Sequence, residues 1–145
     1  MKSKEDLFQL GIKVIIKNSK GEILLLKVNK EKIKEFEGEA YWDIPGGRIH
    51  KGSTIGETLR REVEEETGIV DIQSIEPFTM TLSNIRIPYL DSDTGLILSI
   101  YSCEVDDIDK ITLSNEHSEY KWANPKEASK LLEVKYPKEF TEKIR

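Results

Sequence analysis

A glycine turn followed by a glutamate-rich stretch constrains this chain more than any other feature. From Gly46 to Ile69 the sequence reads GGRIHKGSTIGETLRREVEEETGI. Thr54 can cap a helix with its hydroxyl while Glu57 reaches back in a capping box, and Gly68 can supply a left-handed stop. The segment therefore predicts a helix from about Ile55 to Thr67.

The predicted helix has two different faces. One is an apolar ridge of residues four apart, namely Ile55, Leu59 and Val63. Glu62, Glu65 and Glu66 cluster on the adjoining face. Glu62 and Glu66 repel each other at i,i+4 and destabilise the helix by a few tenths of a kcal/mol. Such a face is either a solvated acidic surface or a cation site, because hard divalent cations prefer oxygen ligands.

The other elements predict one domain, residues 1–145, in which a sheet carries helices on its faces. The charged segment from Lys30 to Glu39 predicts an exposed loop. Strand formers and turn residues predict a hairpin of Gly11–Lys17 and Glu22–Val28 around a turn at Asn18–Gly21. Further strands are predicted at Tyr41–Ile44, Val70–Phe78, Met80–Tyr89, Leu96–Val105 and Tyr120–Ala123. A turn at Asp91–Gly95 is predicted before the strand at Leu96–Val105. Asn124 and Pro125 open a second predicted helix, which ends near Val134.

Composition narrows the cellular setting and the partners. The chain has 22 basic and 27 acidic residues and a formal charge of −5, which argues against the basic stripe that nucleic-acid polymers require. No run is apolar and long enough to cross a membrane, so we expect no membrane partner. The lone Cys103 lies in an apolar run and is expected to be buried rather than reactive. These features predict a cytoplasmic protein whose partner is a small molecule, and a homodimer stays open.

The segment from Gly47 to Ile69 resembles the Nudix box, G-x5-E-x7-R-E-U-x-E-E-x-G-U, where U is aliphatic. All defined positions but one match, namely Gly47, Arg61, Glu62, Val63, Glu65, Glu66, Gly68 and Ile69. The exception is Ser53, where the family normally places its first glutamate. His50 stands where many members carry another acid. The resemblance implies a Nudix-like α/β/α sandwich (α+β) with a mixed central sheet.

The resemblance also implies a role for each matching residue. Glu62, Glu65 and Glu66 match the metal-binding glutamates, and the cofactor would be Mg²⁺ or Mn²⁺. Arg61 matches the arginine that orients a catalytic carboxylate. The glycine turn at Gly46 and Gly47 can offer a backbone carbonyl to the metal.

The general base is either a glutamate of the box or a loop acid before the final strand. Glu116 is similar to that loop acid, and an exposed, uninvolved side chain is the alternative interpretation. His50 and His117 have no ligand partner at a fixed spacing, so we expect surface or loop roles for both and leave them out of the catalytic set. Aromatic side chains in strand-like segments are expected in the core, namely those of Trp42, Phe78, Tyr89 and Tyr101.

Two functions remain open from the sequence. The intact glutamates and Arg61 favour a hydrolase that cleaves the pyrophosphate bond of a nucleoside diphosphate linked to another moiety. Its substrate would be ADP-ribose or a related nucleoside diphosphate sugar, or a modified nucleoside triphosphate such as 8-oxo-dGTP. Ser53 is the feature that favours the alternative, a catalytically weakened nucleotide-binding regulatory module.

Overall fold

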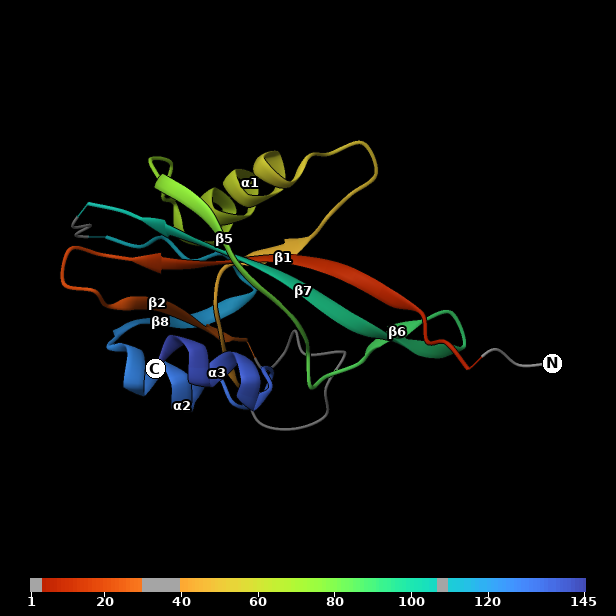
Figure 1. Cartoon of the computed structure of the whole chain (residues 1–145). Coiled ribbons are helices and arrows are strands. Elements are labelled where there is room, and N and C mark those ends of the chain that lie inside the picture. Colours follow the sequence, from red (N-terminus) through yellow and green to blue (C-terminus); the bar gives the residue numbers. More distant parts are fainter. Residues whose placement is uncertain (1–3, 30–39, 107–109) are drawn as a thin grey trace.

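The computed structural model describes residues 4–29, 40–106 and 110–145, and within them a sheet lies between helices. Figure 1 shows α1 over one face of the sheet and α2 and α3 over the other. The elements are β1 (Phe8–Lys17), β2 (Ile23–Val28), β3 (Trp42–Asp43), β4 (Gly46–Arg48), α1 (Ile55–Thr67), β5 (Gln73–Leu82), β6 (Ile87–Tyr89), β7 (Ser92–Glu104), β8 (His117–Ala123), α2 (Pro125–Leu131) and α3 (Lys138–Ile144). The expected α/β/α sandwich is confirmed. The predicted loop at Lys30–Glu39 lies outside the described residues.

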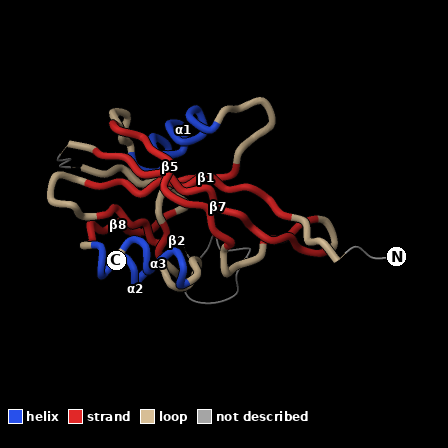
Figure 2. The backbone as a smooth tube through the Cα atoms, in the orientation of Figure 1, coloured by secondary structure: helices blue, strands red, loops and turns tan. Residues whose placement is uncertain are grey.

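The sheet is mixed, as expected. Its main path runs β3-β2-β1-β7-β5, with β4 on β1, β6 on β7 and β8 on β2. β1 and β7 are parallel from the Phe8–Gly95 pair to the Lys17–Glu104 pair, and the other pairs are antiparallel. Figure 2 shows these strands crossing the centre of the molecule between the helices.

The predicted hairpin of β1 and β2 is confirmed at its turn, but the two strands pair with each other over a shorter stretch than predicted. The Asn18 side chain accepts hydrogen bonds from the backbone N–H of Lys20 and of Glu22, each at 3.0 Å. The Cα register pairs only Lys17 with Ile23. The strands then diverge because β4 pairs with β1 at Gly11–Lys13 while β2 pairs with β3 and β8.

Two apolar clusters cover the two faces of the sheet. Alternate residues of β1 divide between them, with Ile15 toward α2 and α3 and Val14 and Ile16 toward α1. Leu59 and Val63 of α1 are fully buried, whereas Ile55 at the start of the helix is exposed. The apolar ridge is therefore one residue shorter than predicted.

The ends of α1 are those predicted from the sequence. The Thr54 hydroxyl accepts from the backbone N–H of Glu57 at 3.1 Å, and the Glu57 side chain completes the capping box. Gly68 ends the helix in the left-handed region at φ 80°. Both caps fix the register of α1, and with it the direction in which each glutamate projects.

The strand boundaries after α1 are a correction. Residues predicted as two strands separated at Thr79 form the single strand β5, and the chain turns after Leu82. The predicted turn at Asp91–Gly95 lies largely within β7, where Gly95 pairs with Phe8. Gly95 reads as a turn residue in the sequence, but here it leaves room for the Phe8 ring, which lies 2.5 Å from the position a Cβ would take.

The second predicted helix is shorter than expected, and a third was missed. α2 ends at Leu131, and α3 follows after a break that contains Pro137. Tyr136, Phe140 and Ile144 are spaced four apart and pack into the core on that side, so the signal for α3 was present.

Several side chains outside the site also bear on the predictions. Cys103 is buried as predicted, and burial raises the pKa of its thiol to about 12. The core prediction is wrong for Phe78 and Tyr89, which are exposed, while Trp42 and Tyr101 are half-buried. In the described part of the chain, no helix has the length and apolar character needed to cross a bilayer.

Candidate functional site

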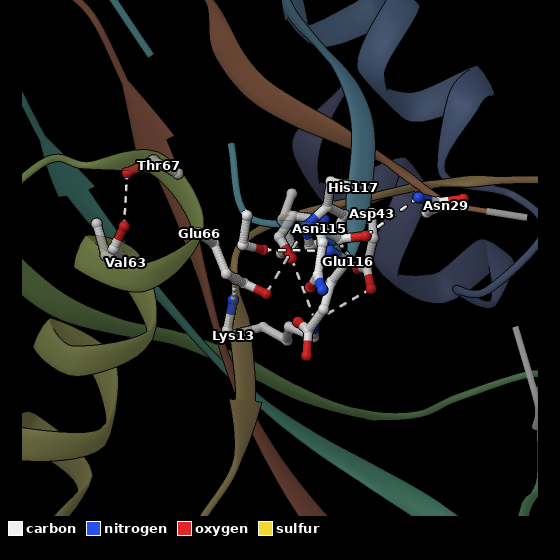
Figure 3. A network of polar contacts seen from close by, with 12 residues as sticks. Lys13, Asn29, Asp43, Val63, Glu66, Thr67, Asn115, Glu116 and His117 are labelled. Atoms are coloured by element: carbon white, nitrogen blue, oxygen red, sulfur yellow. Dashed lines mark hydrogen bonds and ion pairs between the residues drawn. The ribbon is translucent and has the colours of Figure 1, made fainter. Parts of the chain in front are cut away.

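A cavity of about 470 Å³ opens beside the glycine turn and the end of α1. It is lined by Gly11, Lys13, Val28, Tyr41, Asp43, Gly46, Gly47, Arg48, Glu66, Ile85, Ile87, Leu96, Leu98, Asn115, Glu116, His117 and Lys135. Figure 3 shows Glu66 reaching from α1 toward Glu116 and His117, which lie at the start of β8. Polar groups from separate parts of the chain thus converge on one cavity that also has apolar walls, as is typical of small-molecule sites.

Glu66 is the buried carboxylate of this cavity. It is 4% exposed, and its Oε1 accepts a hydrogen bond from the backbone N–H of Gly46 at 2.8 Å. Burial raises the pKa of Glu66 to about 8, although the Lys13 ammonium opposes that shift. A buried carboxyl group that is protonated near neutral pH can lose its proton when a cation binds and neutralises the carboxylate.

Gly46 and Gly47, where the sequence predicts a turn, lie in strand β4 and contact the glutamates directly. Gly46 has φ +149°, and a Cβ there would lie 2.1 Å from the carbonyl oxygen of Ile12. The backbone N–H of Gly46 contacts Glu66, and a backbone carbonyl of Gly46 or Gly47 as a metal ligand stays a prediction. A Cβ on Gly47 would lie 2.6 Å from Cδ of Glu62, so the Glu62 carboxylate packs against this glycine.

Glu62 is half-buried and held by its neighbours. Arg61 Nη2 donates to Glu62 Oε1 at 3.3 Å, which agrees with the predicted orienting role of that arginine. Burial raises the pKa of Glu62, Arg61 opposes the shift, and Glu65 and Glu116 add to it. Glu116 is therefore close enough to raise the pKa of Glu62 on α1 from the other side of the site.

A methyl group on Gly47 is expected to reduce catalysis without unfolding the protein. Gly47→Ala must displace the carboxylate of Glu62, and a shift near 1 Å at a reacting group costs about tenfold to 100-fold in rate. The matched control is Gly56→Ala, because nothing lies within 4 Å of a Cβ at that exposed helical position. Steady-state kinetics should show a large loss of kcat/KM for the first variant and none for the second. Equal kinetics for both would contradict this role of Gly47.

The remaining predicted acids differ in their placement. Glu65 is exposed and does not line the cavity. Glu116 is exposed and does line it, and its backbone carbonyl accepts from Asn29 N–H at 2.8 Å. The structure thus brings Glu66 and Glu116 together and leaves Glu65 out of the cavity lining.

His117 corrects the sequence-based expectation of a surface or loop role. It is 9% exposed, and its Nδ1 lies 4.0 Å from Oε2 of Glu66. Burial and the Lys13 ammonium lower the pKa of His117 to about 4. The predicted strand boundary was wrong. β8 begins at His117 rather than at Tyr120, so this residue is the first of the strand and not part of a loop.

A buried charge cluster at the base of the cavity was also missed. Asp43 Oδ2 accepts from Lys13 Nζ at 3.0 Å and from Lys135 Nζ at 2.6 Å, and Oδ1 accepts from the Tyr136 hydroxyl at 2.5 Å. Burial alone would raise the pKa of Asp43, but the two lysines hold it well below its usual value. Lys135 is 92 residues from Asp43 in sequence, so no local pattern reveals their contact.

Ser53 and His50 lie away from this cavity. The backbone N–H of Ser53 donates to the carbonyl of His50 at 3.1 Å in the loop before α1. Neither residue lines the cavity, and His50 is exposed as expected. The position at which the chain departs from the Nudix box therefore removes no carboxylate from the cavity wall.

The donor atoms around Glu66 fit a divalent cation. One ligand atom from each of Glu66, Glu116 and His117 lies within 4.8 Å of the other two. Carboxylate oxygens and an imidazole nitrogen are common ligands of divalent metals in proteins. Glu62 and Glu65 lie on the same helix as Glu66 but outside this group of three.

Comparison with known proteins agrees with the site. The family model of the NUDIX domain matches residues 7–144. Asymmetrical bis(5'-nucleosyl)-tetraphosphatase from Mus musculus is 33% identical over 121 residues, which cover 81% of this chain and 74% of that protein. Nucleoside triphosphatase NudI from Salmonella typhimurium is 36% identical over 97 residues, which cover 63% and 66% of the two proteins.

Solved structures share the fold. The MutT protein from Methanosarcina mazei Go1 has a TM-score of 0.69 and 27% identity, with 98% of this chain and 94% of that chain covered. The C. elegans Ap4A hydrolase, in a binary complex, also has a TM-score of 0.69 at 19% identity, over 94% and 93% of the two chains. With a family model that spans almost the whole chain and hydrolases among its relatives, the chain belongs to the Nudix family and is a pyrophosphohydrolase.

Proposed function

We propose that the chain hydrolyses a P–O–P bond in a nucleotide that carries several phosphates in a row, and that it requires Mg²⁺ or Mn²⁺. The observation that carries this proposal is the buried carboxylate of Glu66, which faces Glu116 and His117 across the cavity. A buried carboxyl group beside a second carboxylate and an imidazole does not stabilise the fold by itself. A divalent cation would accept electron pairs from all three groups.

The residues of the site have different proposed roles. Glu66 and Glu116 would hold the cation, with Glu62 and Glu65 beside them. A bound divalent ion lowers the pKa of water and neutralises phosphate charge. Glu62 is the proton acceptor we assign, because Arg61 donates a hydrogen bond to it and burial raises its pKa. Lys13, at the base of the cavity, adds positive charge near the phosphates.

The relatives favour a nucleoside polyphosphate over ADP-ribose. The named proteins are a bis(5'-nucleosyl)-tetraphosphatase and a nucleoside triphosphatase, and both names describe chains of phosphates. The apolar wall of Ile85, Ile87, Leu96 and Leu98 offers a surface against which a base can pack. A cytoplasmic location and a homodimer stay predictions from the sequence.

A substrate panel tests the proposal. We expect kcat/KM for diadenosine tetraphosphate or a nucleoside triphosphate to exceed that for ADP-ribose by at least about tenfold, a difference of about 1.4 kcal/mol in transition-state binding. The panel includes 8-oxo-dGTP, and chromatography of the products identifies the bond that is cleaved. Preference for ADP-ribose would overturn the substrate assignment. Tight nucleotide binding without metal-dependent turnover would instead support the regulatory module that Ser53 suggests.

A further inference from the structure

We infer that His117 binds the divalent metal ion directly through Nδ1, together with Glu66 and Glu116, so that the site has a nitrogen ligand beside its carboxylates. This inference deepens the proposed function and rests on it for the presence of the metal. It adds a nitrogen ligand to the carboxylates already assigned to the cation.

The first observation is that His117 Nδ1 is buried without a hydrogen-bond partner. Among the described residues, only this nitrogen and the Thr94 hydroxyl are buried side-chain polar atoms that lack one. A buried polar group without a hydrogen-bond partner destabilises the fold. His117 lines the cavity that Glu66 and Glu116 also line, and its Nδ1 faces the carboxylate of Glu66. A ligand in that cavity would remove this destabilisation.

The second observation is the distance between His117 and Glu66. Nδ1 and Oε2 are 4.0 Å apart, which is too far for a hydrogen bond. Metal–nitrogen and metal–oxygen bonds are each about 2.1 Å long, so one ion can touch two atoms at this separation. A carboxylate oxygen of Glu116 lies within 4.8 Å of a ring nitrogen of His117 and of a carboxylate oxygen of Glu66, and Glu116 is exposed, so its side chain has room to move toward the ion.

The backbone holds this arrangement in place from both sides. His117 pairs with Val28 in the sheet, and its N–H donates to the carbonyl of Ser114 at 3.4 Å. The backbone N–H of Glu116 donates to the Ser114 hydroxyl at 3.3 Å. The two consecutive ligands are therefore fixed by β8 and by the turn before it, whereas Glu66 is fixed by α1 and Gly46.

A nitrogen ligand also changes which metal ions the site prefers. Because imidazole favours Co²⁺ and Zn²⁺ more than Mg²⁺, the nitrogen ligand should widen the metal range of the site.

Electron spin-echo spectroscopy of the protein loaded with Mn²⁺ tests the inference without any substrate. We expect the wild-type spectrum to show coupling to a directly bound nitrogen, and expect His117→Ala and His117→Asn to remove it. His50→Ala is the matched control, since His50 is the other histidine of the chain and lies exposed outside the cavity. Protein without a histidine tag is required. Binding of Mn²⁺ without nitrogen coupling, or with coupling that His117→Ala leaves unchanged, would overturn the inference.

Calorimetric titration with Co²⁺ and Mg²⁺ provides a second readout. His117→Asn should weaken Co²⁺ binding by about tenfold to 100-fold and Mg²⁺ binding by less, whereas His50→Ala should change neither. Glu66→Gln separates the two proposals. If the wild type binds metal, the glutamate variant does not, and His117→Asn binds normally, the metal site stands and its nitrogen ligand is wrong. If the wild type binds no divalent metal, both proposals fail.

Discussion

Glu66→Gln is expected to lower kcat/KM by at least about 100-fold in saturating Mg²⁺, because the variant keeps the shape of the side chain and removes its negative charge. The glutamine oxygen can still accept the hydrogen bond from the Gly46 N–H, so the glycine turn should stay in place. What is lost is the buried carboxylate that we assign to the metal ion.

Stability should change in the opposite direction to activity. Burial raises the pKa of Glu66 to about 8 in the folded protein, above the value of about 4.3 in an unfolded chain. Its contribution to the free energy of unfolding is therefore fully present below about pH 4.3 and is lost as the pH rises through about 8. The glutamine variant cannot ionise, so without metal it should be at least as stable as the wild type at pH 8.

Kinetics and thermal unfolding of the same samples check both parts. Glu64→Gln is the matched control, because Glu64 is exposed on the same helix and lies outside the Nudix pattern. A glutamine variant at position 66 with normal kcat/KM would contradict the assigned role. A variant that unfolds at pH 8 while the control does not would show that Glu66 acts mainly through structure.

Asp43→Asn should destabilise the fold by about 3–5 kcal/mol, because it leaves two buried ammonium groups without their carboxylate. Asp43 is 3% exposed, and it accepts hydrogen bonds from both Lys13 and Lys135. An asparagine oxygen can accept one of these bonds, but it carries no charge to offset the burial of the lysines. Denaturant unfolding near pH 7 measures the difference.

The pH dependence of unfolding identifies the charge as the cause. The lysines hold the pKa of folded Asp43 below its unfolded value of about 3.9, so its stabilising contribution is present above that pH and is lost as the pH falls through the folded pKa. The difference between wild type and variant should therefore shrink below about pH 4. Glu142→Gln is the control, since its ion pair with Lys138 at 3.9 Å is exposed and contributes about 0–1 kcal/mol. A pH-independent difference at position 43 would point to packing instead.

The sequence predicted correctly those elements whose ends are determined by hydrogen bonds and backbone conformations within a few residues. The capping box of Thr54 and Glu57 and the left-handed Gly68 gave the bounds of α1 correctly. The turn at Asn18–Gly21 was correct for the same reason, because a side chain and a glycine define it within a few residues. The order of the elements and the family resemblance predicted a mixed sheet between helices, whereas the strand order within that sheet was not predicted.

The rest depends on contacts between distant residues. Lys135 meets Asp43 only because α2 and α3 fold across the sheet, and nothing near either residue signals the pair. His117 reads as a polar loop residue in SNEHSEYKW, yet pairing of β8 with β2 buries it. Gly95 reads as a turn residue, yet β1 lies beside it as a parallel neighbour. In each case tertiary contact outweighs local propensity.

Metal removal and replacement test the central claim most directly. The purified protein is treated with a chelator, exchanged into metal-free buffer, and assayed on diadenosine tetraphosphate and a nucleoside triphosphate before and after Mg²⁺ or Mn²⁺ is added. We expect hydrolysis to fall to background without metal and to return as the ion saturates the site in the wild type, but not in Glu66→Gln. Hydrolysis that persists in metal-free protein, or that Mg²⁺ restores equally in both proteins, would contradict a metal site built on Glu66.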